Sequence, residues 1–308
     1  MNAGRLIHTA QALVDEVIDV PFLPRRGANA VATARRQQAG GAVTVLLAAA
    51  RSGAVCTHAG SVGRGPAGDL IRATLQADGV TVCSPVIEDI DTGMCLVFVE
   101  PSAERTFVTV QGAERRISLA SLSTSAPQPG DYVAVSGYTL QGPTATPLLE
   151  WLATLAPGVQ VVLDPGSAFA ELDEATRAAA LAHTTIWTSN ADEAKFMTGS
   201  ANMAVSAGAL LAHLPPGALA IVRDGPAGCA VSGWCKTTSV TGFPQTPYDT
   251  NGAGDTHTGV MLAELLSGTN PVTAARRANA AGALKVIRRG ADTIPTAAEI
   301  DAFLAVRR

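Results

Sequence analysis

Short apolar runs alternate with longer helical patterns along much of this 308-residue chain, and this alternation constrains the fold more than any other feature. Residues 132–137 read as a buried strand, residues 147–155 as a helix and residues 159–164 as the next strand. Further strands are expected at residues 185–188 and 218–223. Parallel strands joined by crossover helices give this pattern. The sequence therefore predicts an α/β fold with a mainly parallel central sheet flanked by helices.

Length and composition favour one large domain over residues 1–308, because 47% of the residues are apolar and can bury a sizeable core. The net charge is −4 and the 22 Lys and Arg residues form no basic stripe, which argues against nucleic-acid binding. No long uncharged apolar run and no signal-peptide pattern occurs, so we expect a cytoplasmic protein without membrane contact. The five dispersed cysteines lack zinc-ligand spacing and are expected to be free thiols.

Polar or glycine-rich loops follow the predicted parallel strands, at Asp164, Asn190 and Gly225. Ligands of open α/β sheets bind outside the carboxyl ends of the strands, so these loops are expected to converge on one cleft. Two segments, residues 12–20 and 93–111, depart from the alternation and read as strands in hairpins. From the residues alone, these hairpins would form an antiparallel edge of the main sheet.

The run Asp-Thr-Asn-Gly-Ala-Gly-Asp at residues 249–255 lies directly before an apolar helical pattern. Glycines let the backbone approach an anion, and the first N–H groups of a helix have no internal partners, so Gly252, Ala253 and Gly254 are predicted to form an anion hole. Asp255 falls in the first helical turn, where it can accept a proton from a hydroxyl. The combination indicates phosphoryl transfer to an alcohol. A tight turn followed by a capping Asp explains the same letters.

Residues 249–256, with Gly259, closely resemble the carboxy-terminal signature of the ribokinase (PfkB) family of carbohydrate kinases. Residues 39–54 are similar to the amino-terminal signature of that family. The resemblance implies a ribokinase-like three-layer fold in which strands from about 12–38 and 91–113 form a small β lid over the sugar. Family lids often pair with the lid of a second subunit, which leaves a homodimer open.

On the nucleotide side, Asn190 and Glu193 resemble the family's Asn-x-x-Glu motif, which organises Mg²⁺, water and phosphates. The resemblance therefore assigns Asn190 to ATP and Glu193 to Mg²⁺ through water, which fits an ion that takes few protein ligands. A helix cap at Asn190 with Glu193 as its capping-box partner is the alternative.

The loop after the strand at 218–223 resembles the family's glycine loop beside the nucleotide, and it assigns Arg223, Gly225 and Gly228 to ATP binding. Arg223 stands where Thr or Lys is more usual. Asn279 matches a position that borders the adenine, although a solvent-facing helical Asn is the alternative. No P-loop motif occurs.

On the acceptor side, the resemblance implies that Asp15 binds sugar hydroxyls and that Gly40 and Gly41 let the backbone approach the sugar. Thr44 stands where the family often has Asn, and a Thr hydroxyl cannot donate the two N–H bonds of an amide. This departure counts against ribose and leaves a ketose-type acceptor open. Arg105, in the expected lid, is a candidate for an anionic substituent of the substrate, with a surface Arg as the alternative.

The resemblance also implies a monovalent cation, K⁺, held by the Asp249 carboxylate and by backbone carbonyls after Asp249 and in residues 286–290. His257 stands where the family usually has Phe, and we interpret it as a packing residue. The three lysines include no obvious phosphate ligand.

Together these features predict an ATP-dependent, Mg²⁺-requiring carbohydrate kinase, a phosphotransferase with an alcohol acceptor (EC 2.7.1.-). Two alternatives stay open: a kinase for a nucleoside or another small alcohol on the same fold, and a sugar or nucleotide sensor that has lost activity.

Overall fold

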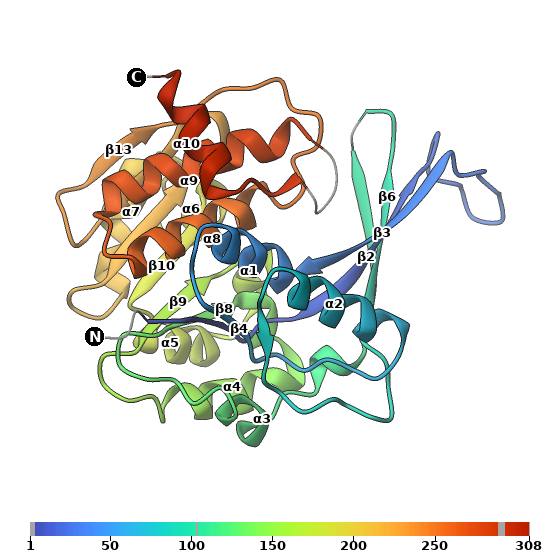
Figure 1. Cartoon of the computed structure of the whole chain (residues 1–308), viewed down its shortest axis with the longest axis horizontal. Coiled ribbons are helices and arrows are strands. Elements are labelled where there is room, and N and C mark those ends of the chain that lie inside the picture. The colour runs from blue at the N-terminus through green and yellow to red at the C-terminus, as the bar shows by residue number, and fades with distance from the viewer. Residues whose placement is uncertain (1–3, 103, 289–292, 308) are drawn as a thin grey trace.

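The computed structural model describes residues 4–102, 104–288 and 293–307. Within these ranges, nine strands form one sheet in the order β13-β12-β11-β10-β9-β8-β1-β4-β5 (Figure 1). The strands are β1 (Leu6–His8), β4 (Cys56–His58), β5 (Thr81–Val82), β8 (Tyr132–Ser136), β9 (Gln160–Asp164), β10 (Ile186–Asn190), β11 (Leu219–Arg223), β12 (Gly228–Ser232) and β13 (Thr238–Thr241). The seven strands from β11 to β5 are parallel to their neighbours, whereas β12 and β13 are antiparallel. The predicted mainly parallel sheet is confirmed.

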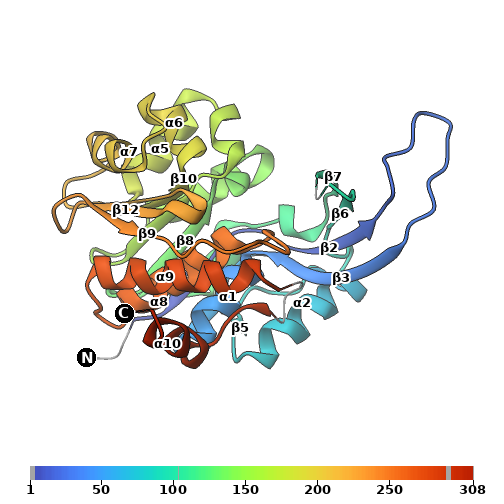
Figure 2. The same cartoon turned by 90° about the horizontal axis from the view of Figure 1, so that it is seen from above.

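Alternate residues of the central strands face two separate apolar cores, as expected for a sheet that is covered on both sides. In β11, Leu219 and Ile221 belong to one core and Ala220 and Val222 to the other. The helices divide in the same way, so that the sheet lies between two helical layers (Figure 2). The first layer contains α1 (Ala42–Arg51), α2 (Pro66–Ala77), α8 (Ala253–Leu266), α9 (Pro271–Val286) and α10 (Ala297–Ala305), and the second α3 (Leu119–Ser123), α4 (Ala145–Leu152), α5 (Glu174–His183), α6 (Ala191–Thr198) and α7 (Met203–Leu210).

Four further strands form a second, smaller sheet that extends away from the main body (Figures 1 and 2). Its order is β3-β2-β6-β7, built from β2 (Ala12–Asp19), β3 (Ala34–Gly41), β6 (Met94–Val99) and β7 (Arg105–Val110). The prediction from the residues alone, that these hairpins form an antiparallel edge of the main sheet, is therefore wrong. The edges of the main sheet are β5 and β13. The four strands of the smaller sheet, which is the lid, pair with one another instead.

The described part of the chain contains no helix that is both long and apolar enough to cross a bilayer.

Candidate active site

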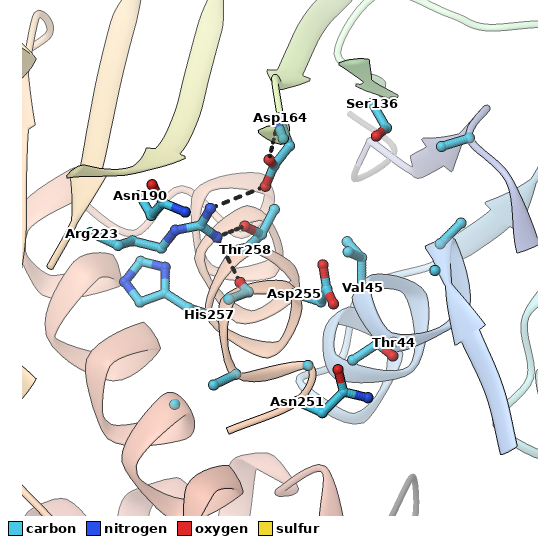
Figure 3. Close-up of a pocket in the computed structure, with 18 of the residues that line it drawn as sticks. Thr44, Val45, Ser136, Asp164, Asn190, Arg223, Asn251, Asp255, His257 and Thr258 are labelled. Carbon is cyan, nitrogen blue, oxygen red and sulfur yellow. Dashed lines mark hydrogen bonds and ion pairs between the residues drawn. The ribbon is translucent and has the colours of Figure 1, made fainter. Parts of the chain in front are cut away.

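A cavity of about 1090 Å³ lies at the carboxyl ends of the main-sheet strands, between them, the lid and the start of α8. Four polar side chains at its wall each end a strand: Ser136 of β8, Asp164 of β9, Asn190 of β10 and Arg223 of β11 (Figure 3). Parallel register places them side by side, with Ser136 opposite Asp164 and Asn190 opposite Arg223. The strand-end loops thus converge on one cleft, as the sequence predicted.

The turn before α8 has the geometry of an anion hole. Gly252 caps the helix at φ 70°, a left-handed conformation that favours glycine. The N–H of Ala253 makes a long hydrogen bond of 3.3 Å to the Thr250 carbonyl. Among the described residues, none accepts a hydrogen bond from the N–H groups of Gly252, Gly254 or Asp255. Three amides are therefore free to bind an anion in the cleft.

Asp255 lies in the first turn of α8, half-buried, and its carboxyl points into the cleft (Figure 3). Burial raises its pKa to about 7, and the carboxylates of Asp164, Asp15 and Glu193 add to the increase, whereas the Arg223 guanidinium opposes it. A carboxyl group with this pKa can exchange protons at neutral pH, which suits a general base.

Arg223 connects the end of β11 with the start of α8. Its guanidinium donates to the Gly254 carbonyl at 2.7 Å and to the Thr258 hydroxyl at 2.6 Å, and it forms an ion pair with Asp164 at 3.2 Å (Figure 3). The side chain thus holds the anion hole in position relative to the sheet. Two glycines of the loop after Arg223 also line the cleft. Gly225 has φ 48°, and a Cβ added at Gly228 would lie 2.1 Å from the Val240 carbonyl oxygen.

Asn190 and Glu193 form the capping box that the sequence left as an alternative. The Glu193 N–H donates to Asn190 Oδ1 at 2.8 Å, and the Asn190 N–H donates to Glu193 Oε2 at 2.9 Å. Both side chains nevertheless line the cleft. Burial and the nearby Asp164 carboxylate raise the pKa of Glu193. A cation in this acidic part of the cleft would relieve the repulsion, so the donor set fits Mg²⁺ bound mainly through water.

Asn279 of α9 is buried, so the alternative of a solvent-facing helical Asn is wrong. Its amide donates to the Val240 carbonyl at 3.0 Å, and its Oδ1 lies 3.1 Å from His257 Nε2. His257 is itself buried, and burial lowers its pKa to about 3, which keeps the imidazole neutral. Both residues border the cleft, and the contact supports a packing role for His257.

The acceptor end of the cleft is built by the lid. Asp15 of β2 accepts hydrogen bonds from the side chains of Gln38 and Asn251, and burial raises its pKa to about 6. An added Cβ at Gly40 would lie 2.5 Å from the Asp15 carboxylate, so a glycine is needed there. Gly41, which directly precedes α1, has φ 62°, and its missing side chain leaves room for the Gln11 carbonyl.

Thr44, in the first turn of α1, lines the cleft directly opposite the anion hole. A Cβ added to Gly252 would lie 3.1 Å from the Thr44 methyl carbon. The first turn of α1 and the turn before α8 are therefore close neighbours at Thr44 and Gly252. This proximity places the expected acceptor residues beside the expected base.

Arg105 and Asp249 do not line this cleft but a neighbouring cavity of about 330 Å³ under the same face of the lid. Arg105 donates to the Thr250 hydroxyl at 2.7 Å and lies 3.5 Å from Asp249 Oδ1. Its guanidinium is therefore engaged with the turn before the anion hole. Of the segment 286–290 named for the monovalent cation, residues 289 and 290 lie outside the described residues.

Sequence reasoning missed the role of Asn251, which reaches from the anion-hole turn to the Asp15 carboxylate. It also missed Thr258, one helical turn after Gly254, which accepts from Arg223. Both positions lie within or just beyond the recognised motif. Their polar side chains, in or close to a turn that must face the cleft, were the signal that could have identified them.

Known proteins share both the sequence pattern and the fold. The family model of the pfkB family carbohydrate kinases matches residues 9–297. The chain is 30% identical over 292 residues to an uncharacterised sugar kinase of Escherichia coli, YegV, with 94% of this chain and 90% of that one covered. It is also 30% identical over 302 residues to a ribokinase of Haemophilus influenzae, with 94% and 95% covered.

Among solved structures, an Escherichia coli protein provisionally named ribokinase II, in complex with ATP and Mg²⁺, has a TM-score of 0.83. The match covers 98% of this chain and 99% of that one at 22% sequence identity, which shows the ribokinase-like fold. Because the family model spans nearly the whole chain and agrees with the site geometry, this chain belongs to the pfkB family of carbohydrate kinases.

Proposed function

We propose that this carbohydrate kinase transfers the terminal phosphoryl group of ATP to a hydroxyl of a sugar or sugar derivative, with Mg²⁺ as its metal. The observation that carries the proposal is the start of α8, where the Asp255 carboxyl points into the cleft beside three amides that have no hydrogen-bond acceptor among the described residues. Phosphoryl transfer asks the protein mainly for positioning, charge stabilisation and a proton acceptor. The α8 start supplies the last two.

In this mechanism, Asp255 takes the proton from the acceptor hydroxyl while the N–H groups of Gly252, Gly254 and Asp255 stabilise the negative charge that develops on the transferred group. Arg223 holds the Gly254 carbonyl and thereby keeps the amides aimed at the cleft. Asp15, with Gly40, Gly41 and Thr44, orients the acceptor. Closure of the lid would exclude water and protect ATP from hydrolysis.

For the nucleotide, we propose that ATP lies along Asn190, Arg223, Gly225 and Gly228, with Asn279 near the adenine. Glu193 would hold Mg²⁺ through water, and the metal would neutralise phosphate charge. A structurally similar Escherichia coli protein was solved with ATP and Mg²⁺, which supports ATP and Mg²⁺ as the ligands of this cleft. The monovalent cation expected beside Asp249 fits the described residues poorly, because Arg105 already pairs with that carboxylate, so we derive no step through K⁺.

We further propose one kinase domain over residues 1–308, acting in the cytoplasm, with lid strands from about 12–38 and 91–113. A homodimer through the lid belongs to the same proposal. The family membership favours a sugar acceptor over a nucleoside, and a ketose type stays among the candidate sugars. The intact Gly-Ala-Gly-Asp run at residues 252–255 favours an active kinase over an inactive sensor.

The decisive test is an acceptor panel of aldoses, ketoses, sugar acids and nucleosides, assayed by ADP release with ATP and Mg²⁺. Asp255→Asn should reduce kcat on the best acceptor by about 10²- to 10⁴-fold, because the proton acceptor is lost. ATP affinity, measured by calorimetry without acceptor, should stay near that of the unchanged protein. Near-native turnover of Asp255→Asn would refute the assignment, and nucleotide binding without ADP release across the panel would favour the sensor.

A further inference from the structure

Lys285 is a buried lysine beside the turn that forms the anion hole. It is the penultimate residue of α9 and only 4% exposed. Its Cε lies 3.8 Å from the position that a Cβ on Gly252 would occupy. Lys285 is not among the residues that line the cleft, although its helix neighbours Gly282, Ala283 and Val286 are. The side chain therefore reaches the turn before α8 without lining the cleft.

The ammonium group of Lys285 donates no hydrogen bond to any residue that the structure describes. Asp249 and Asp255 act on it as opposite charges, and Arg105 acts on it as a like charge. Desolvation of this largely buried side chain lowers the pKa of Lys285, so the charged form is held there at a cost in free energy. A costly buried charge beside an active-site turn is a candidate for a functional role.

The surroundings of Lys285 coincide with the expected monovalent-cation site, and they are unfavourable for such an ion. The Val286 carbonyl already accepts the N–H groups of Tyr248 at 2.7 Å and Asp249 at 3.0 Å. The Arg105 guanidinium lies 3.5 Å from Asp249 Oδ1. The described half of the site thus carries two fixed positive charges, which would repel K⁺.

We propose that the Lys285 ammonium is a built-in cation that takes the place of an exchangeable K⁺ beside the anion hole. From this position, its charge stabilises the turn of Gly252 to Asp255 while phosphate charge gathers at the amides. Lys285 is a positioning residue, because it contacts the turn and not the substrate. The proposal rests on the proposed kinase function.

The test compares the unchanged protein with Lys285→Met, Lys285→Arg and Lys285→Ala while K⁺ is titrated into a choline buffer. The unchanged protein should turn over equally with and without K⁺. Lys285→Met should lose about tenfold or more in kcat with little change in acceptor KM, whereas Lys285→Arg should keep most activity. Lys285→Ala opens space at the site, so K⁺ or NH₄⁺ should restore part of its turnover; methionine fills that space and should block the rescue.

Lys236, an exposed lysine on a surface loop, provides the matched control, and Lys236→Met should leave turnover unchanged. Thermal unfolding excludes a merely structural role, since Lys285→Met should be at least as stable as the unchanged protein. The proposal is overturned if the unchanged protein requires K⁺, or if Lys285→Met is fully active.

Nucleotide binding separates this proposal from the kinase proposal. In calorimetry without acceptor, Lys285→Met should weaken ATP binding more than ADP binding, because only ATP places a terminal phosphate in the anion hole. Equal effects on ATP and ADP would overturn the role of Lys285. This readout stays informative even if no acceptor in the panel is phosphorylated, an outcome that would count against the proposed function alone.

Discussion

The start of α8 and the acceptor end under the lid are built in different ways. At the start of α8, the anion hole and Asp255 are adjacent in sequence, and one helix terminus carries them all. At the acceptor end, Asp15 depends on Gln38 from the neighbouring strand and on Asn251 from the turn before α8. The residues of the reaction chemistry are therefore contiguous in sequence, whereas the residues that bind the acceptor come from distant segments.

The largest effect that would test this comparison is expected from Gly252→Ala. The added methyl group would lie 3.1 Å from the Thr44 methyl carbon at a position with φ 70°, so the turn must shift. Displaced amides should reduce kcat by roughly 10²-fold, as for the loss of an oxyanion-hole donor. Gly268→Ala is the control, because Gly268 also has a positive φ, 85°, but no neighbour within 4 Å of the added Cβ. It should lose similar stability and keep its activity; equal activity losses would show that the turn has no special role.

The acceptor side should respond differently to substitution. Asp15→Asn replaces a hydrogen-bond acceptor for sugar hydroxyls with an amide and should raise the acceptor KM by roughly 10-fold or more, with a smaller change in kcat. Steady-state kinetics at saturating ATP provide the measurement. Asp19→Asn, on the same face of the same strand but paired with Arg36, is the control and should leave KM nearly unchanged. A loss confined to kcat would mean that Asp15 belongs to the chemical machinery instead.

Measurements of stability and activity at several pH values can separate the effect of Asp255 on folding from its role in catalysis. Because its pKa is about 7 in the folded protein and 3.8 in the reference state, the folded protein binds more protons between these values. The contribution of Asp255 to stability is therefore fully present at low pH and is lost as the pH rises through about 7. Asp255→Asn should unfold at higher temperature than the unchanged protein at pH 8, by the equivalent of about 1–3 kcal/mol, and show little difference near pH 4. Activity should rise with pH through about 7, and a flat stability difference would contradict the raised pKa.

The smallest effect is expected at His257, which is buried against Asn279 outside the proposed proton path. His257→Phe removes one hydrogen bond and should cost about 1 kcal/mol of stability. Turnover and its pH dependence should change little, because the imidazole is already neutral. A large loss of kcat at constant stability would show that the chemical machinery extends beyond the first turn of α8.

The same contrast explains how much the sequence could predict. The parallel strands and the α8 start were predictable, because apolar runs and a contiguous glycine turn carry their own signals. Strand β1 was missed, since its three residues show no periodicity and it is defined by pairing with β4 and β8. The buried position of Lys285 was equally hidden, because it depends on how α9 packs beside the turn. Contacts between distant segments, such as Asn279 with His257, leave no local pattern.

The contact between Arg105 and Thr250 has a consequence for the order of events in a catalytic cycle. Arg105 belongs to the lid, and Thr250 lies two residues before the anion hole. A lid that swings outward must release this contact or pull on the turn, so the catalytic amides are coupled to whether the acceptor is enclosed. The Arg105–Thr250 contact therefore holds the anion hole in its catalytic geometry when the lid is closed.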